Sequence, residues 1–505
     1  QMNNSIDQML VDYEGNLWFT SSRQGVMKIV KNPFSDIFER YNVNNAVVNS
    51  TCIYSKKLFV GTDNGLIVLN TAGRVKKFPV LEVKAKNKAL TEYDDLIALL
   101  DGIRIRSIIR DSQGRVWFST YGNRGLVMYD GRCVTCYTTE DGLPSERVRA
   151  ICEGKDGKTF IACTGGLAIL DEKKGIEDVF NERAGLSNSE ILTVAQADNG
   201  DLILGSDGDG IYIISDGVIS NVGFEEGLSS EVILRIKKDE KRGIFWIVTS
   251  NSIAYMTEDH QVTTVKNFPY SNNFDLVENS NGEMWVLSSN GIYVAKTDQL
   301  LANEEIQTVF YNFDNGLPCV ATANSYSDIS DDGNLYIAGA SGVVKVNIDK
   351  PLDEVEEIKM AVPYIEADGE LIYSSDNHFV VPAKTRRITV YGYVYTYSLM
   401  NPKVTYMLRG FDKDQTTVSR SEFEPVDYTN LKGGTYKFVM NLQDEMGRGN
   451  NELVVTIEKE KAIYEKLWFI ILCIVLAIAL ILGIVLAYVR SRVARLEKKQ
   501  AENKI

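Results

Sequence analysis

Four cysteines lie close enough in the sequence to raise the question of metal or redox chemistry. Cys133 and Cys136 form a Cys-x-x-Cys pair, and Cys152 and Cys163 follow. Such cysteines can bind zinc or form a redox disulfide. If residues 133–136 form a strand, however, the pair points to opposite faces. Cys163 also takes a place that Thr or Ser holds in related segments. We therefore expect packing cysteines, with no metal site and no cofactor.

Two other patterns resemble catalytic or metal sites less closely. Residues Ser206 to Gly210, SDGDG, place two carboxylates two positions apart, but the further oxygen ligands and the distal Glu of a calcium loop are missing. A turn is the better interpretation. The sequence contains only His260 and His378, which disfavours His-based metal centres and general bases. We expect no catalytic residue in the chain.

A third pattern, Asp-x-x-Gly-x-x-Trp, is present from Asp111 to Trp117. It resembles the Asp-box of sialidase-like propellers, in which the Asp is structural. The pattern therefore predicts a propeller and not catalysis. A glycoside hydrolase would also need two converging carboxylates, which a linear sequence cannot show.

These patterns belong to a repeat that runs through most of the chain. GRVWFST and GEMWVLS are two of its copies, and most successive copies lie 39 to 43 residues apart. The Trp-like position is occupied by Trp18, Phe59, Trp117, Phe160, Ile203, Trp246, Trp285 and Tyr336. A second marker that contains Gly-Leu, as in DGLPSERV and EGLSSEVI, recurs with the same period. Each copy contains four short β-rich segments separated by Gly turns, as in a propeller blade.

The repeats define the domain organisation that we expect. The fold class is all-β. Residues 42–350 should form a β-propeller, with seven blades favoured and eight possible. Residues 1–41 should then be the last blade of a truncated upstream propeller, or a first blade. An insertion at residues 81–102 should form a short helix over one face.

Residues 351–460 alternate in the manner of an immunoglobulin/fibronectin-like β-sandwich. Its segment VYGYVYTY should be one strand that carries Tyr391, Tyr393, Tyr395 and Tyr397 on a single face. A face that packs against the other sheet is favoured for this stripe, and a platform for stacking sugars is the alternative.

Residues 467–489 contain no charged side chain and should form a transmembrane helix. Their 23 residues give about 35 Å of helix, enough for a hydrocarbon core of about 30 Å. Residues 490–505 carry six Lys or Arg and two Glu, a net charge of +4, which places the C-terminus in the cytoplasm. This tail should start a signalling coiled coil or be a solvated helix.

The part before residue 490 then carries −14 − 4 = −18, which argues against nucleic acid as its ligand. The chain begins without Met or a signal peptide although the topology demands export, so we expect it to be truncated at its N-terminus.

Two family patterns are matched in this sequence. The first is matched by Gly142, Leu143, Pro144, Ser145, Val148, Asp156 and Gly157, and in a neighbouring repeat by Asp111, Gly114, Trp117, Thr120, Gly125 and Leu126. The second is matched by Tyr406, Leu408, Gly410, Asp412, Tyr428, Asn430, Leu431, Gly434, Thr435 and Tyr436. The chain thus resembles bacterial receptors that join two-component regulator propeller repeats to a three-tyrosine domain.

The resemblance implies a periplasmic or extracellular sensor, often for oligosaccharides, that acts as a homodimer. Its signal would pass through one membrane helix to a histidine kinase, an HD-type phosphodiesterase or a diguanylate cyclase. A tethered scaffold or adhesion module is the first alternative, and a surface glycoside hydrolase is the second. We expect the ligand in the propeller funnel or on the face covered by residues 81–102, but the sequence does not identify the binding residues.

Overall fold

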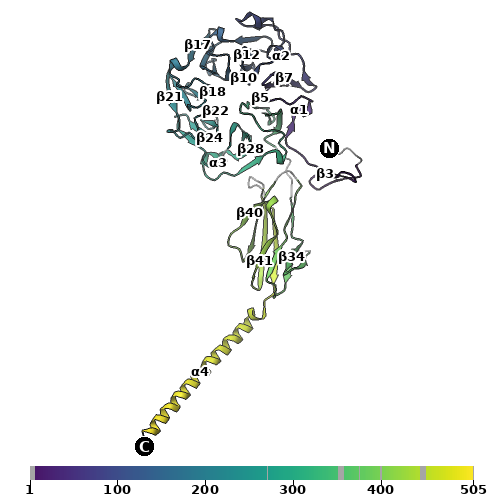
Figure 1. Ribbon diagram of the computed structural model, residues 1–505, viewed down its shortest axis with the longest axis vertical. Coiled ribbons are helices and arrows are strands. Elements are labelled where there is room, and N and C mark those ends of the chain that lie inside the picture. Colours follow the sequence, from purple (N-terminus) through teal and green to yellow (C-terminus); the bar gives the residue numbers. More distant parts are fainter. Residues whose placement is uncertain are drawn as a thin grey trace. The chain divides into compact units, whose positions relative to one another are not determined.

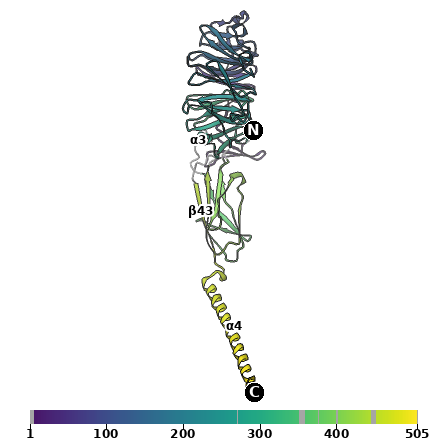
Figure 2. The ribbon, with the colours of Figure 1, turned by 90° about the vertical axis from the view of Figure 1, so that its left-hand side faces the viewer.

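The computed structural model describes residues 6–269, 271–350, 358–374, 376–397, 401–443 and 451–503. Its contacts divide the chain into two compact units, residues 1–354 and 355–505. The first unit is almost entirely β and is coloured purple to teal in Figure 1. The second contains β-sheets and a long C-terminal helix, which Figure 2 shows from a second direction.

Seven antiparallel sheets in the first unit form propeller-like blades around a common centre (Figure 1). Blades 1 to 3 are β5 (Val48–Tyr54), β6 (Lys57–Thr62), β7 (Gly65–Asn70), β8 (Gly73–Val75); β10 (Arg104–Arg110), β11 (Val116–Tyr121), β12 (Leu126–Tyr129), β13 (Val134–Tyr137); and β14 (Val148–Glu153), β15 (Thr159–Cys163), β16 (Gly166–Asp171), β17 (Gly175–Phe180).

Blades 4 to 6 are β18 (Ile191–Gln196), β19 (Leu202–Ser206), β20 (Ile211–Ser215), β21 (Val218–Val222); β22 (Ile233–Asp239), β23 (Ile244–Thr249), β24 (Ile253–Thr257), β25 (Val262–Thr264); and β26 (Asn273–Glu278), β27 (Glu283–Ser288), β28 (Ile292–Lys296), β29 (Thr308–Tyr311). Blade 7 is β30 (Asp328–Ile329), β31 (Asn334–Ala338), β32 (Val343–Asn347) and β4 (Ser35–Asp36). Apolar side chains of neighbouring blades share cores. Phe59 of blade 1 and Phe118 of blade 2, for example, stack with their ring centroids 6.1 Å apart.

The first repeat marker closes the turn between the first two strands of a blade. The Asp111 carboxylate accepts hydrogen bonds from the indole Nε1 of Trp117 and from the amide of Arg115, both at 2.8 Å. The same carboxylate–indole bond joins Asp12 to Trp18 and Asp239 to Trp246. The Asp of the marker is therefore a structural residue, as expected.

The second marker ends a short 3-10 turn between blades. In η2 (Thr139–Asp141), η3 (Glu182–Ala184) and η4 (Phe313–Asn315) the following glycine is left-handed, with φ of 107° at Gly142. Glycine adopts this conformation without the steric cost that a side chain brings. The next leucine is buried in each case, as at Leu143, which is 4% exposed.

The seventh blade takes its outer strand from the N-terminal part of the chain. Asp36 of β4 pairs with Val344 of β32, and the helix α1 (Ile37–Arg40) follows. Phe38 is fully buried in a core that also contains Val343. Our expected start at residue 42 was therefore too late, because the closing strand lies before it. A two-residue strand gives too little alternation to be recognised in a sequence.

A separate three-stranded sheet precedes the blades, formed by β1 (Gln8–Val11), β2 (Leu17–Ser21) and β3 (Gly25–Ile29). Its Met9, Leu10 and Val26 are 62 to 65% exposed. It carries the same Asp12–Trp18 bond as a blade. Its assignment to an upstream propeller stays a prediction.

The insertion contains β9 (Val83–Lys84), η1 (Lys88–Glu92) and α2 (Leu96–Leu99). The short helix was expected. The strand β9 was not: it pairs in parallel with β13 and extends the sheet of blade 2. Leu90, Leu96 and Leu99 fill the core between the first two blades. Another short helix, α3 (Thr297–Ala302), lies between β28 and β29.

In the second unit two sheets share one core. One is β35 (Glu370–Tyr373), β34 (Tyr364–Ala367), β37 (Arg387–Val390), β41 (Val426–Thr429); the other is β36 (His378–Val381), β43 (Asn451–Lys459), β42 (Gly434–Gln443), β39 (Lys403–Arg409), β40 (Thr416–Ser419). The short β33 (Lys359–Ala361) pairs with β38 (Tyr393–Tyr395), and η5 (Arg420–Glu422) follows β40. Residues of both sheets, including Ile388 and Phe438, form the core.

Two expectations for the tyrosine stripe were wrong. The chain forms two strands, β37 and β38, which belong to different sheets. They separate at Gly392, where an added Cβ would lie 2.8 Å from the sulfur of Met440. Tyr393 and Tyr395 are 38% and 37% exposed, so they do not pack between sheets. Their rings stack with centroids 6.1 Å apart.

Two tyrosines of the second family pattern, Tyr428 and Tyr436, form hydrogen bonds through their hydroxyl groups in this unit. The amide of Leu408 and the hydroxyl of Tyr428 both donate to the Asp412 carboxylate, at 2.7 and 3.1 Å. The Tyr436 hydroxyl donates to the carbonyl of Lys432 at 3.0 Å.

The unit ends in η6 (Ile463–Glu465) and α4 (Leu467–Glu502). By length and composition α4 can cross a membrane, and its apolar side chains are exposed. Glu465 fastens the segment before α4 to the sheet. Its carboxylate accepts from the amide of Gly433 at 3.1 Å and from that of Ala462 at 3.0 Å.

We predict that Asp111→Asn lowers the free energy of unfolding of the first unit by about 1 to 3 kcal/mol at pH 7. Burial alone would raise the pKa of Asp111, but hydrogen bonds from Trp117 and Arg115 outweigh it and lower that pKa. A depressed pKa stabilises the fold above the unfolded pKa of about 3.9, and this stability is lost as the pH falls through the folded pKa. Urea titrations at pH 7 and pH 3, followed by tryptophan fluorescence, should show a smaller difference at pH 3.

Asp156→Asn is the matched control, because its carboxylate is 54% exposed and its blade has Phe160 in place of Trp. The sixth blade indicates that Asp111→Asn will still fold. There Asn279 replaces the Asp, and Trp285 Nε1 has no hydrogen-bond partner in the described part of the chain. Equal losses in both variants at both pH values would contradict the prediction.

We also predict that a chain beginning at residue 42 melts at a lower temperature than one beginning at residue 31. The shorter chain loses β4 and the buried Phe38, which leaves the edge of β32 unpaired. Circular dichroism melting of the two chains tests this. Identical midpoints would show that β4 does not stabilise the fold.

Candidate functional site

Six of the seven blades carry a β-bulge at the same position of their first strand. A bulge inserts an unpaired residue and redirects the neighbouring side chains. The inserted residues are Asn49, Arg106, Arg149, Leu192, Leu234 and Phe274. Each bulge is followed by a buried residue, which is Arg235 in blade 5 and Asp275 in blade 6. Charged side chains are thereby buried inside the first unit, on its innermost strands.

The seventh blade has an additional segment in place of the bulge. After the bridge between Ala321 and Gly339, residues 322–327 precede β30. The amide of Tyr326 donates to the carbonyl of Asn49 at 2.9 Å, and the amide of Thr51 donates to the carbonyl of Tyr326 at 2.9 Å. The segment therefore pairs with the innermost strand of blade 1.

Tyr326 meets the buried charges of blades 5 and 6. The guanidinium carbon of Arg235 lies 3.2 Å from the centroid of the Tyr326 ring. Its Nη2 donates to the carbonyl of Ser325 at 2.6 Å, and its Nε lies 3.5 Å from Oδ1 of Asp275. Lys237 Nζ lies 2.7 Å from the same Oδ1. The four side chains join three blades through one polar network.

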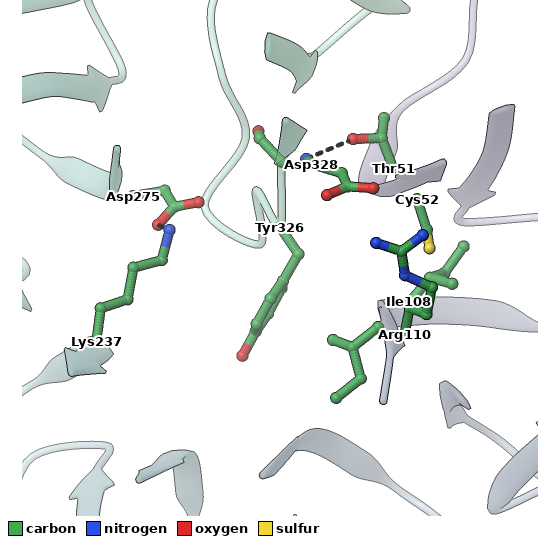
Figure 3. Close-up of a pocket in the computed structure, with 10 residues that line it drawn as sticks. Thr51, Cys52, Ile108, Arg110, Lys237, Asp275, Tyr326 and Asp328 are labelled. Carbon is green, nitrogen blue, oxygen red and sulfur yellow. Dashed lines mark hydrogen bonds and ion pairs between the residues drawn. The ribbon is translucent and has the colours of Figure 1, made fainter. Parts of the chain in front are cut away.

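A cavity of about 250 Å³ opens beside this network. Its lining comes from five blades, with Thr51, Ile108, Lys237, Asp275 and Asp328 as one representative of each. Figure 3 shows Lys237 and Asp275 on one side of Tyr326, and Cys52 and Arg110 on the other. The volume is that of a small solute or of one sugar unit.

Burial affects the ionisation of two groups in this cavity, the Asp328 carboxyl and the Cys52 thiol. It raises the pKa of Asp328, although the amides of Ile53 and Ile329 donate to its carboxylate at 2.6 and 2.9 Å. Burial also raises the pKa of the Cys52 thiol to about 12, with Asp328 as a further cause. Cys52 is therefore a neutral thiol at physiological pH and a poor nucleophile.

The chemistry of the cavity favours binding over reaction. The Asp275 carboxylate is ion-paired with Lys237 and Arg235, and that of Asp328 holds two strand amides. A retaining glycosidase needs a free nucleophilic carboxylate beside a second, protonated one. Here both carboxylates hold strands together. Of the residues that line the cavity, Tyr326 has a hydroxyl with no hydrogen-bond partner among the described residues.

The residues that first raised the question of metal chemistry lie in other parts of the unit. Cys163 is fully buried in β15, and all seven cysteines are free. The SDGDG segment is the turn between β19 and β20, where Asp209 accepts a hydrogen bond from the Tyr212 hydroxyl. Within the described residues no three His, Cys, Asp or Glu side chains are placed to hold a metal ion.

Sequence reasoning did not find Arg235, Lys237, Asp275 or Tyr326. One signal was present in the sequence. The repeat spacing between Trp285 and Tyr336 is 51 residues instead of about 43, and this excess includes the segment that carries Tyr326. Charged residues in a segment expected to be an inner strand were a second signal.

Comparisons with known proteins agree with this architecture. The family model described as two component regulator propeller matches residues 99–122, which include β10 and β11. The extracellular domain of BT3049 from B. thetaiotaomicron, described as a hybrid two component system, has a TM-score of 0.70 and 20% identity over 91% of this chain. The extracellular domain of BT4673 from the same organism, described as a one component system, has a TM-score of 0.52 and 18% identity over 91% of this chain.

A comparison with curated protein sequences finds no match. The matched regions make up 62% of the BT3049 chain and 64% of the BT4673 chain. The chain thus carries a two component regulator propeller repeat on a fold similar to that of these extracellular domains.

Proposed function

We propose that this chain is the extracytoplasmic sensing part of a receptor with a single membrane span. In this proposal the blades form a complete seven-bladed β-propeller that binds a small molecule or an oligosaccharide. The second unit is an immunoglobulin-like or fibronectin-like sandwich, and α4 crosses the membrane through residues 467–489. The observation that carries the proposal is the polar cavity among five blades. Its lining includes Tyr326, whose hydroxyl has no hydrogen-bond partner among the described residues.

The likeness to the extracellular domains of BT3049 and BT4673 supports a sensory role, because those proteins are described as hybrid two component and one component systems. We propose a homodimer that signals to a cytoplasmic histidine kinase, HD-type phosphodiesterase or diguanylate cyclase. The ligand needs only to favour one dimer arrangement. A tenfold difference in its affinity for two arrangements shifts their balance by about 1.4 kcal/mol.

The hydrogen bonds of Glu465 support the proposal that the second unit relays the signal to α4. Only Lys466 separates this residue from the start of α4, and its carboxylate holds Gly433 and Ala462. An added Cβ on Gly433 would lie 2.5 Å from the Cα of Lys461, so the two segments are in close contact. A movement of the sheet therefore reaches the helix with little slack.

We predict that a saccharide or peptide ligand raises the melting temperature of the chain. In Arg110→Gln, about ten times more ligand should be needed for the same rise. Arg110 lines the cavity and is exposed, so its loss should leave the fold intact. The loss of one charge-assisted hydrogen bond lowers the affinity by about this factor. Thermal-shift titration of a saccharide and peptide library provides the measurement.

Arg74→Gln is the matched control, since Arg74 is an exposed residue of β8 that does not line the cavity. If no ligand shifts the melting temperature and the signalling output ignores the whole library, the sensor proposal fails and a tethered scaffold is favoured.

We predict that Gly483→Leu and Ala479→Leu change the self-association of α4 and the signalling output. The two small residues lie four apart on one helix face and permit close helix contact. An added Cβ at Gly483 has open space in the single chain, so a change in behaviour reports on contact between chains. Energy transfer between labelled chains in lipid nanodiscs measures the association.

Ala477→Leu makes the same change in size about 200° around the helix from Ala479, by the 100° per residue of an α-helix. It should leave association and output unchanged. Equal effects of all three variants, or no effect of any, would indicate that α4 is only an anchor.

A further inference from the structure

Three arginines surround one tyrosine at the start of the innermost strands of blades 2 and 3. The guanidinium carbons of Arg106, Arg147 and Arg149 lie 4.8, 5.2 and 5.0 Å from the centroid of the Tyr121 ring. Arg106 and Arg149 are the residues that the bulges insert into β10 and β14. Tyr121 forms a bridge with Arg147, which is exposed. We call these four residues the arginine cluster.

Carboxylates neutralise only part of this positive charge. Glu190 is ion-paired with Arg149, and Asp63 is paired with the nearby Arg104 at 2.9 Å. No ion pair of Arg106 or Arg147 is found within the described ranges. The three arginines of the cluster together with Arg104 carry four positive charges, and Glu190 and Asp63 carry two negative charges, so the balance is 4 − 2 = +2.

Arg106 is the most buried of the three arginines in the cluster. Its side chain is only 9% exposed, and its Nε is buried without a hydrogen-bond partner in the described part of the chain. Burial, and then repulsion from Arg149 and Arg104, lower the pKa of Arg106 to about 10, although Tyr121 and Asp63 act in the opposite direction. A buried charge without a counter-charge is unfavourable unless another group compensates it.

An anionic group is the compensation that this geometry fits. Guanidinium groups present planar sets of N–H donors that match the oxygens of carboxylate, sulfate and phosphate. We infer that the arginine cluster binds the acidic group of a solute, a carboxylate, sulfate ester or phosphate, through Arg106 and Arg147. The aromatic ring of Tyr121 holds the guanidinium groups in place by cation–π contact.

This inference deepens the proposed function and rests on it, because it states that the sensed solute is acidic. The inference also distinguishes two binding regions, which lie one after the other along the same strands. The arginine cluster lies at the bulges, and the cavity residues of β5 and β10 follow after them. A solute longer than one sugar unit then has a polar cavity and a charged subsite on the same set of strands.

The test is a calorimetric titration of the full chain in nanodiscs. Oligogalacturonate, a sulfated oligosaccharide, a neutral oligosaccharide of equal length, inorganic sulfate and inorganic phosphate are the probes. We expect an acidic oligosaccharide to bind, with an affinity that falls as salt is raised. Arg147→Gln and Arg106→Gln should each weaken it at least tenfold, and Arg132→Gln, an exposed arginine after β12, should not change it.

If Arg106→Gln binds none of the probes, its melting temperature without ligand provides a second measurement. A structural arginine would lower the melting temperature when replaced, whereas relief of an uncompensated charge predicts that ligand-free Arg106→Gln melts at the same temperature or higher. A lower melting temperature of Arg106→Gln, together with no binding of any acidic probe, overturns the inference. Binding of inorganic sulfate or phosphate as tight as that of every oligosaccharide also overturns it, since the site would then take a free ion.

The failure of the inference and that of the proposed function give different results. Binding of an acidic probe that depends on Arg147 without a change in output supports the site and contradicts the sensor. A response of the output to a neutral ligand, unchanged in Arg147→Gln, supports the sensor and contradicts the acidic subsite.

Discussion

The repeated β-bulge is the constraint on which the interior of the first unit depends. Six innermost strands insert one residue at the same position, and each insertion breaks the regular alternation of that strand. Beyond the bulge the strands keep apolar contacts between blades. At the bulge they present Asn49, Arg106 and Arg149. The same irregularity thus permits six similar sheets to differ from one another at one position of their innermost strands.

Contacts between blades connect the polar interior of the first unit. Arg235 of blade 5 touches Asp275 of blade 6 and Tyr326 beside blade 7. Buried charges of this kind add little net stability, because desolvation offsets most of their attraction. The apolar cores between blades are therefore the main source of stability of the first unit.

The repeating parts of the fold could be predicted from the sequence, and the irregular parts could not. Asp111 and Trp117, or Gly142 and Leu143, act within a few residues of each other, so local patterns reveal them. The pairing of Asp36 with Val344 depends on the whole unit being folded. A bulge at Arg106 is a property of the pairing between strands, which composition does not record. The outward direction of Tyr393 and Tyr395 was missed because Gly392 divides what looked like a single alternating strand.

The closing strand β4 also determines when the first unit can be completed. Asn32 donates to the carbonyl of Gly316, a residue 284 positions later, and β4 pairs with β32 beyond it. During synthesis β4 leaves the ribosome before any blade, and its partner leaves after six blades. Such distant pairing slows folding. The short edge of β4 therefore has no partner until the last blade has been synthesised, a period in which an unpaired strand can mispair.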